Sequence, residues 1–157
     1  YGLDIKQIGY MFMYIGILGA IVQGGLVGKL NKTFGEKKLL VFGNVFMALG
    51  LLLLPYAPKE FFILVNMIAL ACIAMANGCL SPSITSLLSQ VADKKEQGRV
   101  LGLNQSFGSL ARVVGPAIGG LLYGLNFHSP YILGSFLMVI ALLISNVLVN
   151  QKLKIKS

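Results

Sequence analysis

Long apolar stretches that are almost free of charged side chains restrict the fold of this 157-residue chain more than any other feature. A helix needs roughly 20 mostly apolar residues to cross the hydrocarbon core of a bilayer, which is about 30 Å thick. The sequence therefore predicts an all-α fold, a polytopic transmembrane helical bundle, with residues 1–157 in one transmembrane domain. Five stretches reach the required length: approximately 8–27, 39–57, 61–90, 100–123 and 131–149.

The composition agrees with lipid surroundings. Hydrophobic residues make up 56% of the chain and charged residues only 11%, whereas about 25% of the residues in a typical soluble domain are charged. A soluble domain of this length leaves too much of its surface in water to hide so many apolar side chains. The stretches also lack the alternation of barrel strands, so they favour helices.

Residues that stop helices separate the stretches. Gly35 interrupts the first connection, Ala57-Pro58 ends the second helix, and Ser129-Pro130 opens the last one. The second and fifth stretches are almost entirely aliphatic, with Asn44 and Asn146 as exceptions. We expect these two helices to be peripheral and to face lipid.

The basic residues are distributed unequally between the two sides of the predicted helices. Because basic loops favour the cytoplasmic side, the C-terminus is expected in the cytoplasm and the N-terminal end outside a plasma (inner) membrane. Ten lysines and arginines lie on one side: Lys29, Lys32, Lys37, Lys38, Lys94, Lys95, Arg99, Lys152, Lys154 and Lys156. The other side has Lys6 and Lys59.

The fourth stretch has a polar, small-residue face. Gln105, Gly108, Arg112, Gly115 and Gly119 follow the spacing of one helix face. An arginine in mid-membrane costs about 2.5–3.5 kcal/mol on insertion scales and usually marks a pathway or a pair. None of the five stretches contains an acidic partner. Either Arg112 meets a counter-charge elsewhere or an anionic substrate, or it is a structural clamp on carbonyl and amide groups.

Other polar residues in the stretches have two interpretations. Asn66 and Asn77 are eleven residues apart, three helical turns, and so share a face. Together with Gln23, Tyr14 and Tyr10, they either line a substrate path or form hydrogen bonds between helices.

Glycine and proline shape the fourth stretch further. Gly115-Pro116 removes a backbone donor in mid-helix, which predicts a kink. Gly115 and Gly119, like Gly120 and Gly124, have the spacing that lets membrane helices approach closely.

Several function classes are disfavoured. The net charge of +8 is spread over short loops rather than one phosphate-binding face, so no nucleic-acid partner is expected. Cys72 and Cys79 are interpreted as packing residues, and His128 as a solvated turn residue. There is no nucleotide-binding phosphate loop, and the titratable residues in the stretches do not suit acid–base chemistry. We expect no enzyme activity, cofactor or metal.

The segment 28–38 resembles the signature loop of the major facilitator superfamily. Lys32 stands where that family usually has aspartate, and Thr33 where it has arginine, as in the weaker copy of the loop in the C-terminal half. The matching positions, which the resemblance identifies as a conformational loop, are Gly28, Leu30, Gly35, Lys37 and Lys38.

Residues 98–105, 110–116 and 119–120 look like the eleventh helix of drug/proton antiporters of the tetracycline and multidrug efflux type. The resemblance covers essentially the whole chain, and it implies that the five helices are numbers eight to twelve. Helix seven and the N-terminal half are then missing, and the absence of an initial methionine also suggests a fragment of a longer protein.

The resemblance implies a secondary active transporter that works by alternating access, with protons, a small-molecule substrate and the lipid bilayer as partners. The expected activity is proton-coupled efflux of small amphipathic compounds. Two alternatives stay open: a carrier for an anionic solute such as an organic acid or sugar phosphate, and a membrane subunit or fragment that does not transport.

Overall fold

The structure is a computed structural model that describes the backbone of residues 4–154 and their side chains, except those of residues 26 and 148–154. This part of the chain is helical and contains no strand, which confirms the all-α prediction. The elements in chain order are α1 (Ile5–Ile21), the π-helical segment η1 (Val22–Leu26), α2 (Val27–Phe34), α3 (Glu36–Leu53), η2 (Leu54–Tyr56), η3 (Lys59–Phe61), α4 (Phe62–Val91), α5 (Gln97–Leu125) and α6 (Ser129–Lys154).

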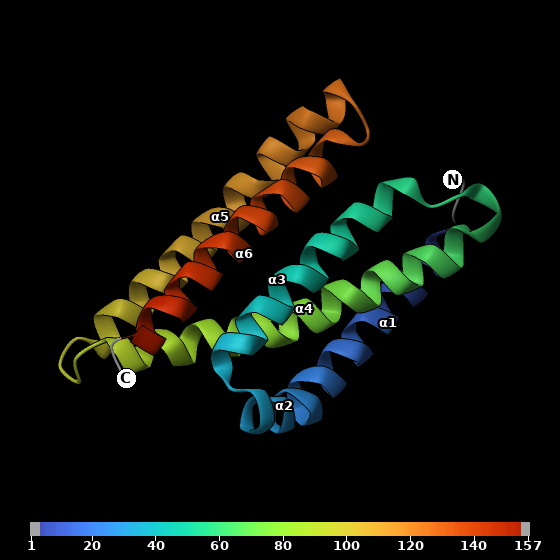
Figure 1. The fold of residues 1–157 in the computed structure, drawn as a ribbon. Coiled ribbons are helices and arrows are strands. Elements are labelled where there is room, and N and C mark those ends of the chain that lie inside the picture. The colour runs from blue at the N-terminus through green and yellow to red at the C-terminus, as the bar shows by residue number, and fades with distance from the viewer. Residues whose placement is uncertain (1–3, 155–157) are drawn as a thin grey trace.

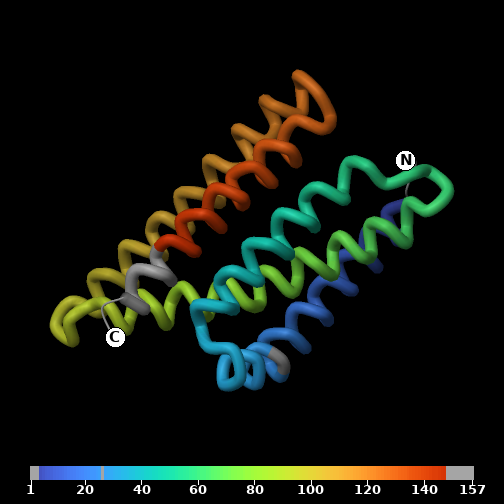
Figure 2. Tube along the Cα trace, in the orientation of Figure 1, coloured from blue at the N-terminus to red at the C-terminus, as the bar shows by residue number. Residues whose placement is uncertain are grey.

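The long helices form two groups that meet along α3 (Figures 1 and 2). Helix α4 packs against α3 and against α1, while α5 and α6 form an antiparallel pair. The pair is attached to the rest mainly through α6, which lies against α3. Helix α5 therefore stands at the margin of the molecule, and none of the residues in its described length is buried.

The predicted helix stops are confirmed. Gly35 has φ 77° and ψ 158° and separates α2 from α3. Ala57 and Pro58 are extended after η2, and α6 begins at Ser129. The segment 28–38 differs from the expected loop, because residues 28–34 belong to helix α2 and only Gly35 interrupts the helical backbone.

Glycines bring α3 and α4 close together. A Cβ atom at Gly43 would lie 2.6 Å from Leu80 Cγ, and one at Gly50 would lie 2.9 Å from the Ala69 carbonyl oxygen. The two glycines are seven residues apart, which places them on the same face of α3. The absence of side chains on this face lets the two backbones approach.

A small apolar cluster holds η1, α2 and α3 against α4. It consists of Val22, Val27, Leu39 and Cys79, which are buried together, with Leu30 and Met75 packed against them. A Cβ atom at Gly78 would lie 2.4 Å from Val22 Cγ1, so η1 contacts the α4 backbone directly. The packing interpretation of the cysteines holds for Cys79, while Cys72 is half-buried.

Polar side chains join α3 to α6. The Asn44 side chain donates to Ser145 Oγ at 3.1 Å, and Ser135 Oγ donates to the Ala48 carbonyl oxygen at 3.1 Å. The expectation that the second helix is peripheral is therefore wrong for this face, because α3 lies between α4 and α6 and Asn44 is buried. Asn146 is exposed, as expected of a peripheral helix.

Within the described residues, four helical segments are long and apolar enough to cross a membrane: Ile5–Gly25, Glu36–Tyr56, Lys59–Val91 and Ser129–Val147. Their outward faces carry large exposed apolar side chains, among them Phe12, Phe42 and Phe136. With 29 residues α5 is also long enough, but its polar and glycine residues lower its hydrophobicity. The fifth span thus stays a prediction.

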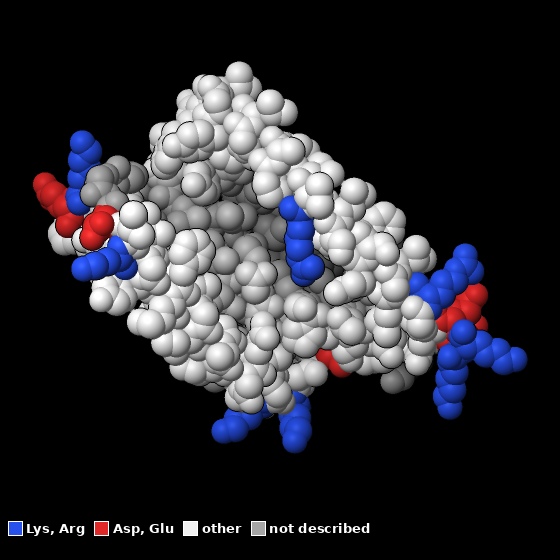
Figure 3. All heavy atoms as spheres, turned by 180° about the vertical axis from the view of Figure 1, so that it is seen from behind, with Lys and Arg blue, Asp and Glu red and all other residues white. Residues whose placement is uncertain are grey.

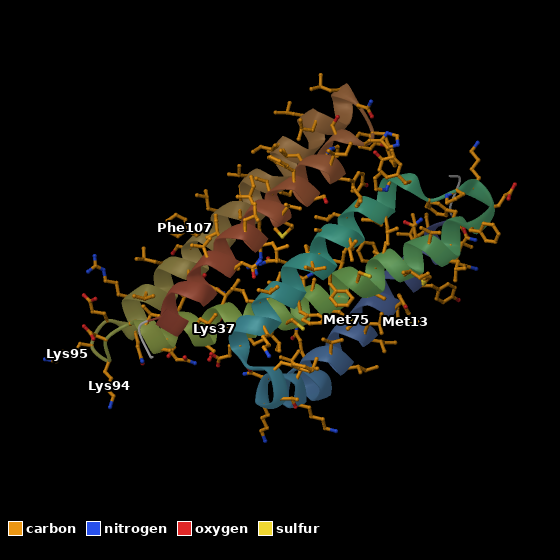
Figure 4. The ribbon with its side chains drawn as sticks, in the orientation of Figure 1. Met13, Lys37, Met75, Lys94, Lys95 and Phe107 are labelled. Carbon is orange, nitrogen blue, oxygen red and sulfur yellow. The ribbon has the colours of Figure 1, made fainter. Side chains whose placement is uncertain are left out.

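The two ends of the bundle differ in chemistry. Residues 28–38, 91–99 and the C-terminal end of α6 lie at one end, which we call the basic end (Figure 1). Lys94 and Lys95 project from it in Figure 4. At the opposite end, the rings of Tyr56 and His128 are tilted by 43° with centroids 5.3 Å apart, and the ring centroids of Tyr123 and Phe127 are 5.7 Å apart. Aromatic residues of this kind are typical of a membrane–water interface.

Candidate functional site

A cavity of about 620 Å³ opens between η1, α2, α4 and the first turns of α5. It lies in the half of the bundle nearer the basic end, where α4 approaches its C-terminus. The molecular surface is also hollowed along the face shown in Figure 3. The residues that line the cavity are Gln23, Val27, Ser81, Pro82, Thr85, Ser86, Ser89 and Leu101.

The polar part of the cavity wall comes mainly from α4. Ser81, Thr85 and Ser89 follow one another at intervals of four residues and therefore lie along one face of the helix. Thr85 Oγ1 donates to the Ser81 carbonyl oxygen at 3.0 Å, so its hydrogen is used within the helix. Among the described residues that line the wall, none has a charged side chain. It offers hydroxyl and amide groups beside the apolar surface of Val27, Pro82 and Leu101.

Gln23 faces this wall from η1. The π-helical segment Val22–Leu26 holds one more residue per turn than an α-helix, and such bulges often re-aim side chains at functional sites. Gln23 is exposed, and its amide forms no hydrogen bond with the described part of the protein. The amide is therefore available to a molecule in the cavity.

Glu36 connects α3 to α4 next to the cavity through hydrogen bonds to its carboxylate. Ser86 Oγ donates to one carboxylate oxygen of Glu36, and Gln90 Nε2 donates to the other. Glu36 lies in the first turn of α3, where the helix dipole favours a negative charge. Nearby, Gln97 Nε2 donates to the Ser89 carbonyl oxygen at 2.9 Å and ties α5 to α4.

Arg112 and Gln105 lie on α5 but not in the cavity wall. Both side chains are exposed, and Arg112 forms no ion pair with the described residues. Arg112 is eleven residues beyond Leu101, a distance of about 16 Å along a helix.

The other predicted pathway residues are dispersed. Asn66 is buried and donates to the Phe62 carbonyl oxygen at 2.8 Å, whereas Asn77 is exposed and donates to the Ile73 carbonyl oxygen at 3.1 Å. Tyr14 is half-buried and Tyr10 exposed on α1. Of the predicted pathway residues, only Gln23 lines the cavity.

The predicted packing glycines of α5 have no neighbour in the described structure. A Cβ atom at Gly115, Gly119 or Gly120 would meet nothing within 4 Å. The helix runs from Gln97 to Leu125 without a break, although Pro116 lies inside it. On the same helix, Phe107 points away from the bundle (Figure 4).

The five residues matched to the signature loop have different surroundings in the structure. Leu30 packs against the apolar cluster, and Gly35 forms the turn. Gly28 and Lys38 are exposed, and Lys37 is half-buried. None of these five residues lines the cavity.

The sequence analysis missed Glu36, Ser86, Ser89 and Gln90. The four-residue spacing of Ser81, Thr85 and Ser89 was a signal that could have identified the polar face of α4. No local signal points to Glu36, because its partners lie 50 and 54 residues away along the chain. In the described part of the chain, no three His, Cys, Asp or Glu side chains gather where a metal could bind.

The sequence model of the Major Facilitator Superfamily matches residues 1–154, nearly the whole chain. The chain belongs to the major facilitator superfamily. Superfamily membership identifies a multi-pass membrane transporter family rather than an enzyme family, and the helical bundle is a partial facilitator fold.

Several curated proteins resemble this superfamily member. Multidrug resistance protein 2 of Bacillus subtilis (strain 168) is 30% identical over 142 residues, which cover 90% of this chain and 34% of that protein. Tetracycline resistance protein, class C, of Escherichia coli is 30% identical over 140 residues, 87% of this chain and 34% of that protein.

Solute carrier family 22 member 18 of Mus musculus is 29% identical over 157 residues, 98% of this chain and 37% of that protein. The chain thus spans about a third of the length of the curated relatives it matches. No solved structure matches it.

Proposed function

We propose that the chain is part of a secondary active transporter that works by alternating access and exports small amphipathic compounds in exchange for protons. The observation that carries this proposal is the open cavity of about 620 Å³, whose wall joins neutral hydroxyl and amide groups to apolar surface. Such a wall suits a molecule that has both polar and apolar parts. Superfamily membership and relatives named for multidrug and tetracycline resistance support the same substrate class.

The proposal includes a helix seven and an N-terminal half that complete the transporter. Two observations support them: the glycine face of α5 has no neighbour within 4 Å at Gly115, Gly119 or Gly120, and the relatives are about three times longer. Because the cavity wall has no carboxylate, the acidic groups that bind the coupled protons are placed in the N-terminal half.

The proposed orientation puts the basic end in the cytoplasm of a plasma (inner) membrane and the N-terminal end of the chain outside. Lysines and arginines of residues 28–38 and 91–99 are gathered at the basic end, which agrees with the preference of basic loops for the cytoplasm. In intact cells, a cysteine at Lys95 should resist a membrane-impermeant maleimide, whereas one at Lys59 should react. The reverse pattern rules this orientation out.

Substrate binding in the cavity can be tested through Gln23. In the complete transporter reconstituted into liposomes, Gln23→Ala removes a free amide from the wall, so the KM for a fluorescent amphipathic substrate should rise about three- to tenfold, the worth of one hydrogen bond. Asn146→Ala, which removes an exposed amide on α6, is the matched control. Equal KM values in the two variants would remove Gln23 from the binding site.

An anionic solute is a second candidate substrate, because Arg112 is exposed and unpaired in the described structure. If Arg112 binds such a solute, an organic acid or sugar phosphate should compete with the substrate, and Arg112→Ala should abolish that competition. If only neutral or cationic compounds compete, and Arg112→Ala leaves transport unchanged, an anionic substrate is excluded.

A further inference from the structure

Ser86 takes part both in the contact between α3 and α4 and in the wall of the cavity. Its hydroxyl donates to the Glu36 carboxylate at the start of α3, and the same residue lines the cavity. Gln90, one turn further along α4, donates through Nε2 to the second carboxylate oxygen and also to Ser86 Oγ at 3.4 Å. The carboxylate therefore holds the C-terminal part of α4 at two points that are one helical turn apart.

This arrangement fixes the direction of the Ser86 hydroxyl group. A serine hydroxyl has one hydrogen to donate and two lone pairs that accept. Because the hydrogen is directed to Glu36 and the oxygen already accepts from Gln90 Nε2, one lone pair remains, and the hydroxyl can present only an acceptor to the cavity. A hydrogen bond to an ionised group is also stronger than one between neutral groups, so the carboxylate holds this orientation more firmly than a neutral partner would.

The partners of Glu36 are neutral. In the described structure its carboxylate is bound by a hydroxyl and an amide and by no lysine or arginine, since the one ion pair that the described residues form is between Glu96 and Arg99. The junction is thus not a surface salt bridge of the kind that contributes little. It joins the first turn of α3 to the C-terminal part of α4, and one of its residues, Ser86, lines the cavity.

We propose that Glu36 is a positioning residue for the substrate cavity: it orients Ser86 so that the hydroxyl oxygen accepts a hydrogen bond from a substrate that carries an N–H or O–H donor. This inference rests on the proposed function. It adds that the substrate must donate, rather than accept, the hydrogen bond that it forms with Ser86 of α4.

The kinetic test uses the complete transporter in liposomes. Glu36→Ala frees the Ser86 hydrogen, so the KM for a donor-bearing amphipathic amine should rise about three- to tenfold with little change in kcat. The KM for its fully alkylated analogue, which lacks the donor, should stay unchanged. Glu36→Gln keeps one acceptor oxygen and should restore part of the affinity. Glu96→Ala, which removes an exposed carboxylate from the α4–α5 connection, is the control for charge.

If Glu36 acts through Ser86, the increases in KM caused by substituting the two residues should not add. In a Ser86→Ala background, Glu36→Ala should add no further increase in KM, because the group on which it acts is gone. Equal losses for the amine and its alkylated analogue, or additive effects of the two substitutions, would contradict the positioning role.

A second measurement separates this inference from the proposed function. With Cys72 and Cys79 replaced by alanine, a cysteine at Ser89 reports the position of the α4 end through its rate of reaction with maleimide. Glu36→Ala should change that rate at least threefold, and Glu96→Ala should not. If the wild-type protein moves no substrate, the proposed function fails, while an unchanged labelling rate defeats the inference about Glu36 by itself.

Discussion

Several polar side chains of α4 form their hydrogen bonds with the backbone of their own helix. Asn66, Asn77 and Thr85 each donate to a carbonyl oxygen four residues earlier. In a membrane, such local bonds satisfy a polar side chain without help from another helix. Gln23 and Ser86 differ, because one has a free amide and the other bonds to a different helix. Both residues line the cavity, where their polar groups can contribute to a binding site together with Ser81 and Ser89.

At the residue scale, Gly35 has a backbone conformation that only glycine adopts readily. Its φ of 77° and ψ of 158° cost any other residue about 1–3 kcal/mol. Gly35→Ala should therefore lower the unfolding temperature of the purified protein in detergent. Gly28→Ala is the matched control, since a Cβ there meets nothing and its φ is not positive. If both variants melt alike, the turn is not strained.

At the element scale, the close contact between α3 and α4 depends on α3 glycines, whereas the glycines of α5 make no such contact in the described structure. Gly43 and Gly50 face α4 at distances that leave no room for a side chain, whereas Gly115 and Gly119 face open space. The small-residue motif in α5 predicts a surface that permits close approach, and this stays a prediction. It does not identify the helix that occupies that surface, and no described helix does.

The contact between α3 and α4 can be tested at Gly50. A methyl group there would lie 2.7 Å from Ile73 Cγ1 and 2.9 Å from the Ala69 carbonyl oxygen. Because the carbonyl belongs to a helix backbone and cannot move aside, Gly50→Ala should destabilise the protein by about 1–3 kcal/mol. Thermal unfolding in detergent measures this loss. Gly16→Ala on α1 meets no atom within 4 Å and should be neutral or slightly stabilising.

Local features of the sequence predicted the local features of the fold. Gly35, Pro58 and Pro130 mark the helix boundaries because their effect on the backbone needs no distant partner. Packing between helices was harder to predict, since it depends on which faces meet. The expectation for α3 failed for this reason: the bond from Asn44 to Ser145 joins residues 101 positions apart. Gln23 was predicted from its polarity and lines the cavity, whereas Glu36 was not predicted, because its partner Ser86 lies 50 residues away along the chain.

At the scale of the whole molecule, the bundle separates its charges from its apolar surface. Apart from Arg112 in the middle of α5, the described lysines and arginines gather at the ends, and large apolar side chains cover the sides of the helices (Figures 3 and 4). Four helical segments can span a membrane by length and composition. Helix α5 combines an exposed arginine with exposed glycines, which suits a helix that faces a polar path or another part of the transporter more than one that faces lipid.

The central claim is that a transmembrane gradient drives a small amphipathic molecule through the complete transporter. It is tested most directly by imposing a pH difference across liposomes that contain the complete protein and following the fluorescent substrate. The account predicts accumulation against the substrate's own gradient, which ends when an uncoupler collapses the pH difference. Substrate movement that only equalises the two concentrations, with or without the pH difference, would contradict it.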